Sequence, residues 1–337
     1  MKKTLILVLI VITMISCKEE KKEFRSDFTL SFGSCNNQLL ANPFWQQLEQ
    51  ENPDVWIWGG DIIYSDTEDM SFLESNYRLQ KEHMDYKSFI KNRPVLATWD
   101  DHDYGINDGG AEYEQKWVSQ QLFLDFLDIP QNSPKRKQKG VYTSQDFKVD
   151  QHEIKIIVLD GRYFRSELKE DPSGQKRYIP DFDDSKTMLG KTQWAWLKNE
   201  LNKSQADFNI IISSVQFLSD QHGFESWGNF PLEQQKLESL ISLSQAKNCI
   251  ILSGDRHISE FSKKEVPGLS YPLVDFTSSG MTHSYEGFKG EENPYRMGQV
   301  VPKKSYGILE FNFEDNKVLM KIRGEQNQTL EQQLIQY

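Results

Sequence analysis

Several features that would point to other classes of protein are missing from this sequence. No apolar run approaches the roughly 20 residues that a membrane-spanning helix needs, and no internal repeat is present. Acidic residues outnumber basic ones, and the formal net charge of -11 argues against nucleic acid as the habitual partner. Neither a haem-attachment nor a dinucleotide-binding signature occurs, so a redox function has no support.

Cysteine is scarce, with only three in 337 residues. If Cys17 is lipidated, only Cys35 and Cys249 remain to form a disulfide in an oxidising compartment. Cys249 opens the apolar run Cys249-Ile250-Ile251-Leu252, which favours a buried structural thiol. We therefore expect no disulfide between Cys35 and Cys249.

The N-terminus resembles a bacterial lipoprotein signal. Lys2 and Lys3 precede a mostly apolar stretch at residues 5–15, which ends at Ser16-Cys17. The resemblance implies cleavage before Cys17, acylation of its thiol, and export to the cell envelope on the periplasmic or surface face of a membrane. An uncleaved interfacial anchor is the alternative. The expected organisation is a signal peptide at 1–16, a lipidated tether at 17–25 and a single domain at 26–337.

The rest of the sequence alternates strand-like and helix-like segments. Runs rich in Val, Ile, Phe and Trp predict strands at 28–32, 55–58, 95–99, 154–159, 208–213, 249–252, 273–277, 308–313 and 318–322. Apolar periodicity predicts helices at 43–50, 77–90, 112–127, 192–201 and 231–243. This alternation indicates a layered α/β domain with a mixed sheet or a pair of sheets, because the last two strands look like an antiparallel hairpin. The long polar stretch at 166–185 is either a functional lid or a solvated excursion.

Four short strings follow directly after predicted strands and carry metal-ligand side chains. They are Gly33-Ser34-Cys35, Gly59-Gly60-Asp61-Ile62-Ile63-Tyr64, Trp99-Asp100-Asp101-His102-Asp103 and Gly254-Asp255-Arg256-His257. The carboxyl ends of strands converge where α/β folds build their sites. Four such strings therefore predict one polynuclear metal centre and a metal-dependent phosphoesterase.

Asp61 and Tyr64 lie three residues apart after a Gly-Gly turn, which lets the backbone approach a neighbour closely. A tyrosine phenolate suits a strongly Lewis-acidic ion, typically ferric iron. Cys35 follows the first predicted strand, and its thiolate could join Tyr64 on that ion. A small buried thiol at a turn is the alternative for Cys35.

The segment from Asp100 to Asp108 concentrates acidic side chains directly after an apolar strand. Carboxylates this close repel one another unless a cation neutralises them, so at least one should be a metal ligand. A solvated acidic loop is the alternative.

Two of the six histidines, His102 and His257, fall within these strings. In an extended chain Asp255 and His257 would point the same way and Arg256 the opposite way. His283, which follows another predicted strand, is as compatible with a structural role as with a substrate contact.

The ordered set of motifs looks like the alkaline phosphatase D (PhoD-like) family of metallophosphatases. Besides the four strings, it includes Asn107, Leu159-Asp160-Gly161-Arg162-Tyr163-Phe164-Arg165, and Leu189-Gly190 with Gln193-Trp194. The resemblance implies a β-sandwich of mixed sheets flanked by helices. It also implies a metal site similar to that of purple acid phosphatases, holding Fe(3+) and Ca(2+).

Carried over by position, the resemblance assigns iron to Cys35, Asp61, Tyr64 and His257, with Asp61 bridging to the second metal. Asp101 and Asp255 stand where the related purple enzymes have asparagine and histidine. These oxygen ligands favour calcium over zinc, and Asn107 is a further candidate ligand. Zn(2+) or Mn(2+) on the same scaffold is the alternative.

The resemblance implies that His102 contacts the phosphoryl group or the leaving oxygen, and that Arg162 and Arg165 clamp phosphate oxygens. His283 is the remaining candidate for a substrate contact. The expected activity is hydrolysis of phosphate esters by metal-activated hydroxide. A catalytically idle envelope lipoprotein, which uses the same fold to bind a ligand, is the alternative, and the oligomeric state is left open.

Overall fold

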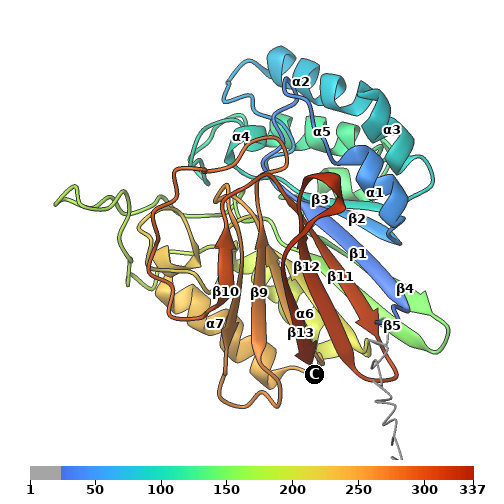
Figure 1. Cartoon of the computed structure of the whole chain (residues 1–337). Helices are drawn as coiled ribbons and strands as arrows, with labels where there is room; N and C mark the ends of the chain where they lie inside the picture. Colours follow the sequence, from blue (N-terminus) through green and yellow to red (C-terminus); the bar gives the residue numbers. More distant parts are fainter. Residues whose placement is uncertain (1–23) are drawn as a thin grey trace, which may run out of the picture.

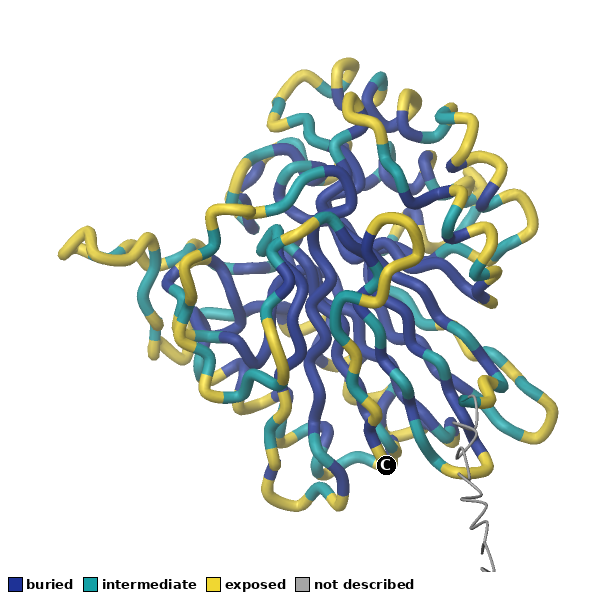
Figure 2. Tube along the Cα trace, viewed as in Figure 1, coloured by how far each residue is buried: buried dark blue, intermediate teal, exposed yellow. Residues whose placement is uncertain are grey.

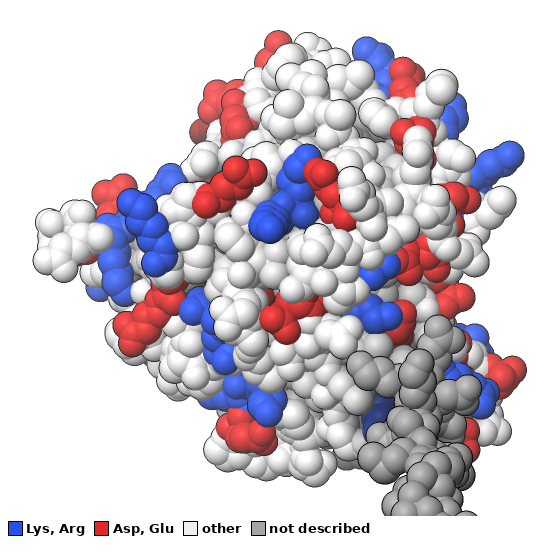
Figure 3. All heavy atoms as spheres, viewed as in Figure 1, with Lys and Arg blue, Asp and Glu red and all other residues white. Residues whose placement is uncertain are grey.

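The computed structural model describes residues 24–337 (Figure 1). The predicted signal peptide, Cys17 and most of the predicted tether lie outside the described residues. Within residues 24–337, no helix combines the length and the apolar character needed to cross a membrane. On the face drawn in Figure 3, acidic and basic side chains are interspersed.

The described chain forms two mixed β-sheets. The first has six strands in the order β13 (Thr329–Gln336), β12 (Lys317–Arg323), β11 (Tyr306–Asn312), β1 (Phe28–Gly33), β2 (Val55–Gly59) and β3 (Val95–Thr98). The second has seven in the order β10 (Arg296–Val301), β8 (Ser259–Lys264), β9 (Leu273–Ser278), β7 (Cys249–Ser253), β6 (Phe208–Ile212), β5 (His152–Val158) and β4 (Thr143–Val149). Each sheet contains a parallel core, β1-β2-β3 in one and β5-β6-β7-β9 in the other.

The two sheets face each other, and helices cover both outer faces. In β2, Val55 and Ile57 belong to the core between the sheets. Trp56 and Trp58 alternate with them and pack on the helical side. Strands that are buried on both faces are consistent with this sandwich, and Figure 2 shows them as the buried centre of the molecule.

The helices fall into two groups. The first sheet is covered by α1 (Trp45–Glu51), α2 (Met70–Glu82), α3 (Met84–Ile90) and α5 (Lys116–Phe126). The second is covered by α6 (Gly190–Lys203) and α7 (Pro231–Leu243). The molecule therefore has four layers, helix, sheet, sheet and helix (Figure 1). This confirms the predicted β-sandwich of mixed sheets flanked by helices.

The structure differs from the sequence prediction at several elements. The single helix predicted at 77–90 is two helices, α2 and α3, because the backbone of His83 leaves the helical region (φ -57°, ψ 119°). Strands β4, β8, β10 and β13 were not predicted, and neither was the short helix α4 (Asp101–Tyr104). Cys35 and Cys249 are both buried and free, which agrees with the expected absence of a disulfide between them.

The carboxyl ends of the parallel strands of both sheets meet at one edge of the sandwich. The amide of Gly280, after β9, donates to the carbonyl of Ser34, after β1, over 3.1 Å. The indole of Trp99, after β3, donates to Asp160, after β5, over 3.0 Å. These bonds tie the two sheets together where the sequence places its metal-ligand strings.

Candidate metal centre

Left-handed backbone brings the candidate ligands together. Cys35, Asp61, Asp255 and His257 have φ angles of 57°, 49°, 70° and 55°. This conformation costs an L-residue about 1–2 kcal/mol, and such strain persists where the surrounding structure fixes it, commonly at functional sites. The expected extended alternation of Asp255 and His257 is therefore wrong, because both residues belong to a left-handed turn after β7.

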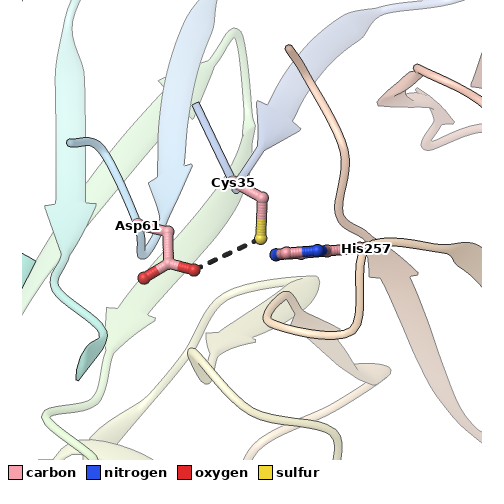
Figure 4. Close-up of side chains that lie close together, drawn as sticks. All are labelled: Cys35, Asp61 and His257. Atoms are coloured by element: carbon pink, nitrogen blue, oxygen red, sulfur yellow. Dashed lines mark hydrogen bonds between the residues drawn. The ribbon is translucent and has the colours of Figure 1, made fainter. Parts of the chain in front are cut away.

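Four side chains form the first part of the site. Cys35, Asp61 and His257 offer ligand atoms that all lie within 4.8 Å of one another (Figure 4). The Cys35 thiol lies 3.3 Å from Asp61 Oδ2. The Tyr64 hydroxyl lies 3.2 Å from the same oxygen and 3.0 Å from His257 Nε2. The set assigned to iron by resemblance is thus gathered around one point.

Four carboxylates form the second part. Asp61, Asp100, Asp101 and Asp255 offer oxygens that all lie within 4.8 Å of one another. Asp61 belongs to both parts, as expected of a bridging ligand. Asp100 joins Asp101 in this cluster, although only Asp101 was predicted as a ligand.

The chemistry of this donor set fits bound cations. The Oδ1 atom of Asp61 is buried and has no hydrogen-bond partner in the described chain. Burial raises the pKa of Asp61 well above its ordinary value, and the charge of Cys35 raises it further. Burial likewise raises the pKa of Asp255, and it raises the pKa of Cys35 to about 12. These groups are stable as anions only when positive charge is placed beside them.

A glycine at position 60 permits this close approach. Gly60 has φ 101°, and a Cβ built on it would lie 2.7 Å from the Cβ of Asp100. Any other residue would push the loop after β2 away from the loop after β3. The Gly-Gly turn therefore sets how closely the carboxylates of the two loops can meet.

His102 is fixed by two contacts at the edge of the cluster. Its Nδ1 atom lies 2.8 Å from the carboxylate of Asp66, and its ring stacks on Tyr64 with centroids 4.2 Å apart. Burial lowers the pKa of His102, but the hydrogen bond to Asp66 and the charge of Asp61 raise it, to a net value of about 10. With Nδ1 engaged, Nε2 is the ring nitrogen left for a substrate.

Arg162 and Arg165 are fully buried. Arg162 pairs with Asp100 and, over 2.6 Å, with Glu225. Arg165 pairs with Glu225 over 2.9 Å. Both guanidinium groups are thus engaged in ion pairs with buried carboxylates, and the phosphate clamp implied by the resemblance stays a prediction.

The two remaining candidates lie at the periphery. His283 packs edge-on against His257, with ring centroids 4.5 Å apart, and its Nδ1 lies 3.0 Å from the Thr282 hydroxyl. Burial and the neighbouring His257 lower the pKa of His283 to about 4. Asn107 is exposed and lines the pocket over the site.

A pocket of about 460 Å³ opens over the cluster. Its wall includes Asp101, His102, Asp255 and His257, together with residues that sequence reasoning did not single out for the site: Asp108, Arg177, Phe224, Glu225, Ser284 and Tyr285. Arg256 also lines it, instead of pointing away. Arg177, Phe224, Glu225, Ser284 and Tyr285 come from loops that carry none of the four ligand strings, and Asp108 ends the acidic segment after β3. Only the folded chain shows that they meet at this pocket.

The chain is similar in sequence to a known family of phosphatases. The profile of the PhoD-like phosphatases matches residues 30–293. Alkaline phosphatase D of Bacillus subtilis (strain 168) is 24% identical over 301 residues, which cover 75% of this chain and 51% of the relative. The chain thus spans about half the length of that curated relative.

Solved structures show the same fold. A structure of PhoD superimposes with a TM-score of 0.69 at 19% identity, covering 92% of this chain and 68% of that one. Purple acid phosphatase PPD1 of yellow lupin (Lupinus luteus) gives 0.63 at 12% identity, with coverages of 92% and 53%. A dimetal phosphatase of Danio rerio gives 0.59 at 12% identity, with coverages of 93% and 100%. With its ordered motifs and its family match over most of its length, the chain belongs to the PhoD-like phosphatase family.

Proposed function

We propose that this chain hydrolyses phosphate esters. The observation that carries the proposal is the cluster of Asp61, Asp100, Asp101 and Asp255 beneath an open pocket, beside Cys35, Tyr64 and His257. Family membership and the dimetal phosphatase fold support it. The alternative, an idle ligand-binding lipoprotein, is not favoured, because four of the predicted metal ligands line one pocket and Cys35, Asp61 and Tyr64 gather beside His257.

The donor sets suggest which ions would bind. Cys35, Tyr64 and His257, with Asp61, form a sulfur, phenolate and imidazole set suited to Fe(3+). The carboxylates Asp61, Asp101 and Asp255 form an oxygen set suited to Ca(2+). Two cations bound here would supply Lewis-acid activation of water and neutralise charge on the phosphoryl oxygens.

The residues of the chain have separate tasks in this proposal. The carboxylates would hold the cations, and Asp61 belongs to both donor sets. His102, held through Nδ1 by Asp66, presents Nε2 to the phosphoryl group or the leaving oxygen. Arg162, which is itself paired with Glu225, forms an ion pair with Asp100. Arg177, half exposed on the pocket wall and paired there with Asp108, is the arginine through which an anionic substrate would be met in this proposal.

Location in the cell envelope, through acylation of Cys17, is part of the proposal and rests on the lipoprotein-like leader. Cys17→Ser should release the protein from the membrane fraction, and mass spectrometry should find a diacylglyceryl group on Cys17 of the wild type. An unmodified, uncleaved N-terminus would rule this part out.

Turnover of bis(p-nitrophenyl) phosphate and p-nitrophenyl phosphate by the metal-loaded mature protein tests the activity. We expect release of p-nitrophenolate from at least one ester, and its loss in Asp61→Ala. Metal analysis on the same sample identifies the bound ions. A fully loaded protein that binds phosphate and cleaves neither ester would instead support the idle binding protein.

A further inference from the structure

Two half-exposed aromatic side chains stand in the pocket over the carboxylate cluster. Phe224 is 42% exposed and Tyr285 is 47% exposed, and both line the same cavity as His102, Asp255 and His257. Their residues lie in different loops, one after β6 and one after β9. Exposed large aromatic side chains in a concave site commonly contact a ligand.

Phe224 is in contact with Arg256, which lines the same pocket. The guanidinium of Arg256 lies 4.3 Å from the centroid of its ring, and Arg256 pairs with Glu291 over 2.6 Å. The next residue, Glu225, is buried and forms ion pairs with two arginines. These contacts anchor the segment whose Phe224 ring lines the pocket.

Tyr285 is tied directly to the candidate metal centre. Its backbone amide donates to the carbonyl of His257 over 2.7 Å. Its ring packs edge-on against Phe288, with centroids 6.3 Å apart. The turn that carries His257 therefore fixes the backbone position of Tyr285.

The cavity is larger than a phosphate group requires. Its volume of about 460 Å³ lies in the range of pockets that bind whole small molecules. A phosphoryl group at the carboxylates would leave room for the organic group of the ester beside the two rings. Aromatic pairs contribute about 0.5–1.5 kcal/mol beyond the area they bury, which is about a 2- to 12-fold gain in affinity.

We propose that Phe224 and Tyr285 bind an aromatic ring in the organic group of the ester, so that aromatic phosphate esters are the preferred substrate class. This inference rests on the proposed phosphoesterase function. It assigns Phe224 and Tyr285 as specificity-determining residues and Arg256 as the positioning residue in contact with Phe224.

Binding of phosphonates, which are not hydrolysed, tests the proposal without relying on turnover. Inorganic phosphate, methylphosphonate and phenylphosphonate are titrated calorimetrically into the metal-loaded mature protein. We expect phenylphosphonate to bind about 3- to 10-fold more tightly than methylphosphonate. Phe224→Ala and Tyr285→Ala should each remove most of this preference and leave the affinity for methylphosphonate unchanged.

Two further variants make the result specific. Phe224→Leu keeps an apolar side chain without a ring and should lose the phenyl preference almost as fully as Phe224→Ala. Phe72→Ala removes a 50% exposed ring on α2, outside the pocket, and should keep the preference.

The outcomes separate this inference from the proposed function. If phosphate and both phosphonates bind but the phenyl group adds nothing, or if Phe224→Ala and Tyr285→Ala both keep the preference, the aromatic subsite is refuted while the phosphoesterase stands. If none of the three anions binds to the metal-loaded protein, the proposed function fails, and the subsite with it.

Discussion

The Nδ1 atom of His102 lies 2.8 Å from each carboxylate oxygen of Asp66. Asp66 and its neighbour Ser65 also donate backbone amides to the His102 carbonyl, so the loop after β2 holds the histidine by its ring and by its backbone. Asp66 stands two residues beyond Tyr64 and was not among the predicted site residues.

His102→Ala should retain its metals and lose roughly 10²–10⁴-fold in kcat, the usual contribution of a proton-transfer group. Asp66→Asn should have a smaller effect on kcat. Because Asp66 raises the pKa of His102, its removal should move the high-pH limb of the rate profile to lower pH. Asp85→Asn, an exposed acid on α3, is the matched control. An unshifted profile in Asp66→Asn would leave Asp66 without a role in positioning His102.

Metal removal should destabilise the protein, because the carboxylates of Asp61, Asp100, Asp101 and Asp255 would then repel one another. A ligand at 100 times its Kd stabilises a fold by about 2.7 kcal/mol, so treatment with a chelator should lower the Tm measurably. Asp101→Asn removes one negative charge from the cluster. It should therefore reduce the difference in Tm between the metal-loaded and the metal-free protein. An identical Tm before and after chelation would argue against a metal centre at this cluster.

Cys35→Ser should weaken iron retention and change the visible absorption of the protein. The reason is that thiolate and phenolate ligands on Fe(III) both give charge-transfer bands, and a serine hydroxyl is a poor anionic donor near neutral pH. Cys249→Ser, in buried β7, is the matched control and should keep the colour. If the wild-type protein is colourless and fully active, the assignment of iron is wrong, and zinc or manganese takes its place.

Arg162→Ala should cost about 3–5 kcal/mol in the free energy of unfolding, because it leaves Asp100 as a buried charge without its arginine partner and Glu225 with Arg165 alone. Arg177→Ala should cost at most about 1 kcal/mol, because Arg177 is half exposed, and should mainly raise KM. Urea unfolding and steady-state kinetics measure both effects. If Arg162→Ala keeps the stability of the wild type but has a raised KM, Arg162 contacts phosphate, as the resemblance implies.

Asp275, which is not a candidate metal ligand, should make the free energy of unfolding depend on pH. Burial raises its pKa from 3.8 to about 6, although the amides of Phe217 and Leu218 and the Ser253 hydroxyl lower it. The folded state therefore binds the proton more tightly, and this group stabilises the fold below pH 4 and loses that contribution as the pH rises through about 6.

Asp275→Asn should abolish the decrease in the free energy of unfolding between about pH 4 and pH 6. For one titrating group this decrease is at most about 1.4 kcal/mol per pH unit. The difference between the urea-unfolding profiles of wild type and variant isolates the effect. Parallel profiles between pH 4 and pH 7 would show that Asp275 has an ordinary pKa.

Much of the sandwich could be predicted because its central strands are buried on both faces and form continuous apolar runs, as in Val55–Gly59 and Cys249–Ser253. The strands that were missed carry weaker signals. Three of them, β4, β10 and β13, are sheet edges with exposed polar residues, and β8 begins and ends with polar ones. Their pairing depends on neighbours that are distant in sequence.

The candidate ligands could be predicted because each follows a strand, and strand ends converge. What the sequence could not show is which charges neutralise one another. Arg162, which the resemblance predicts to contact phosphate, is paired with Glu225, 63 residues further along the chain, and no sequence pattern links the two. Similarly, Phe224 and Tyr285 lie in loops whose paths depend on the whole fold.

The direction of β1 has a consequence for how the protein would work on a surface. The described chain enters the sandwich at Phe28 and reaches the metal-ligand strings only after Gly33 (Figure 1). Six residues of strand span about 20 Å. A lipid anchor attached ahead of Phe24, as proposed, would therefore be joined to the end of β1 that lies farther from the candidate metal centre.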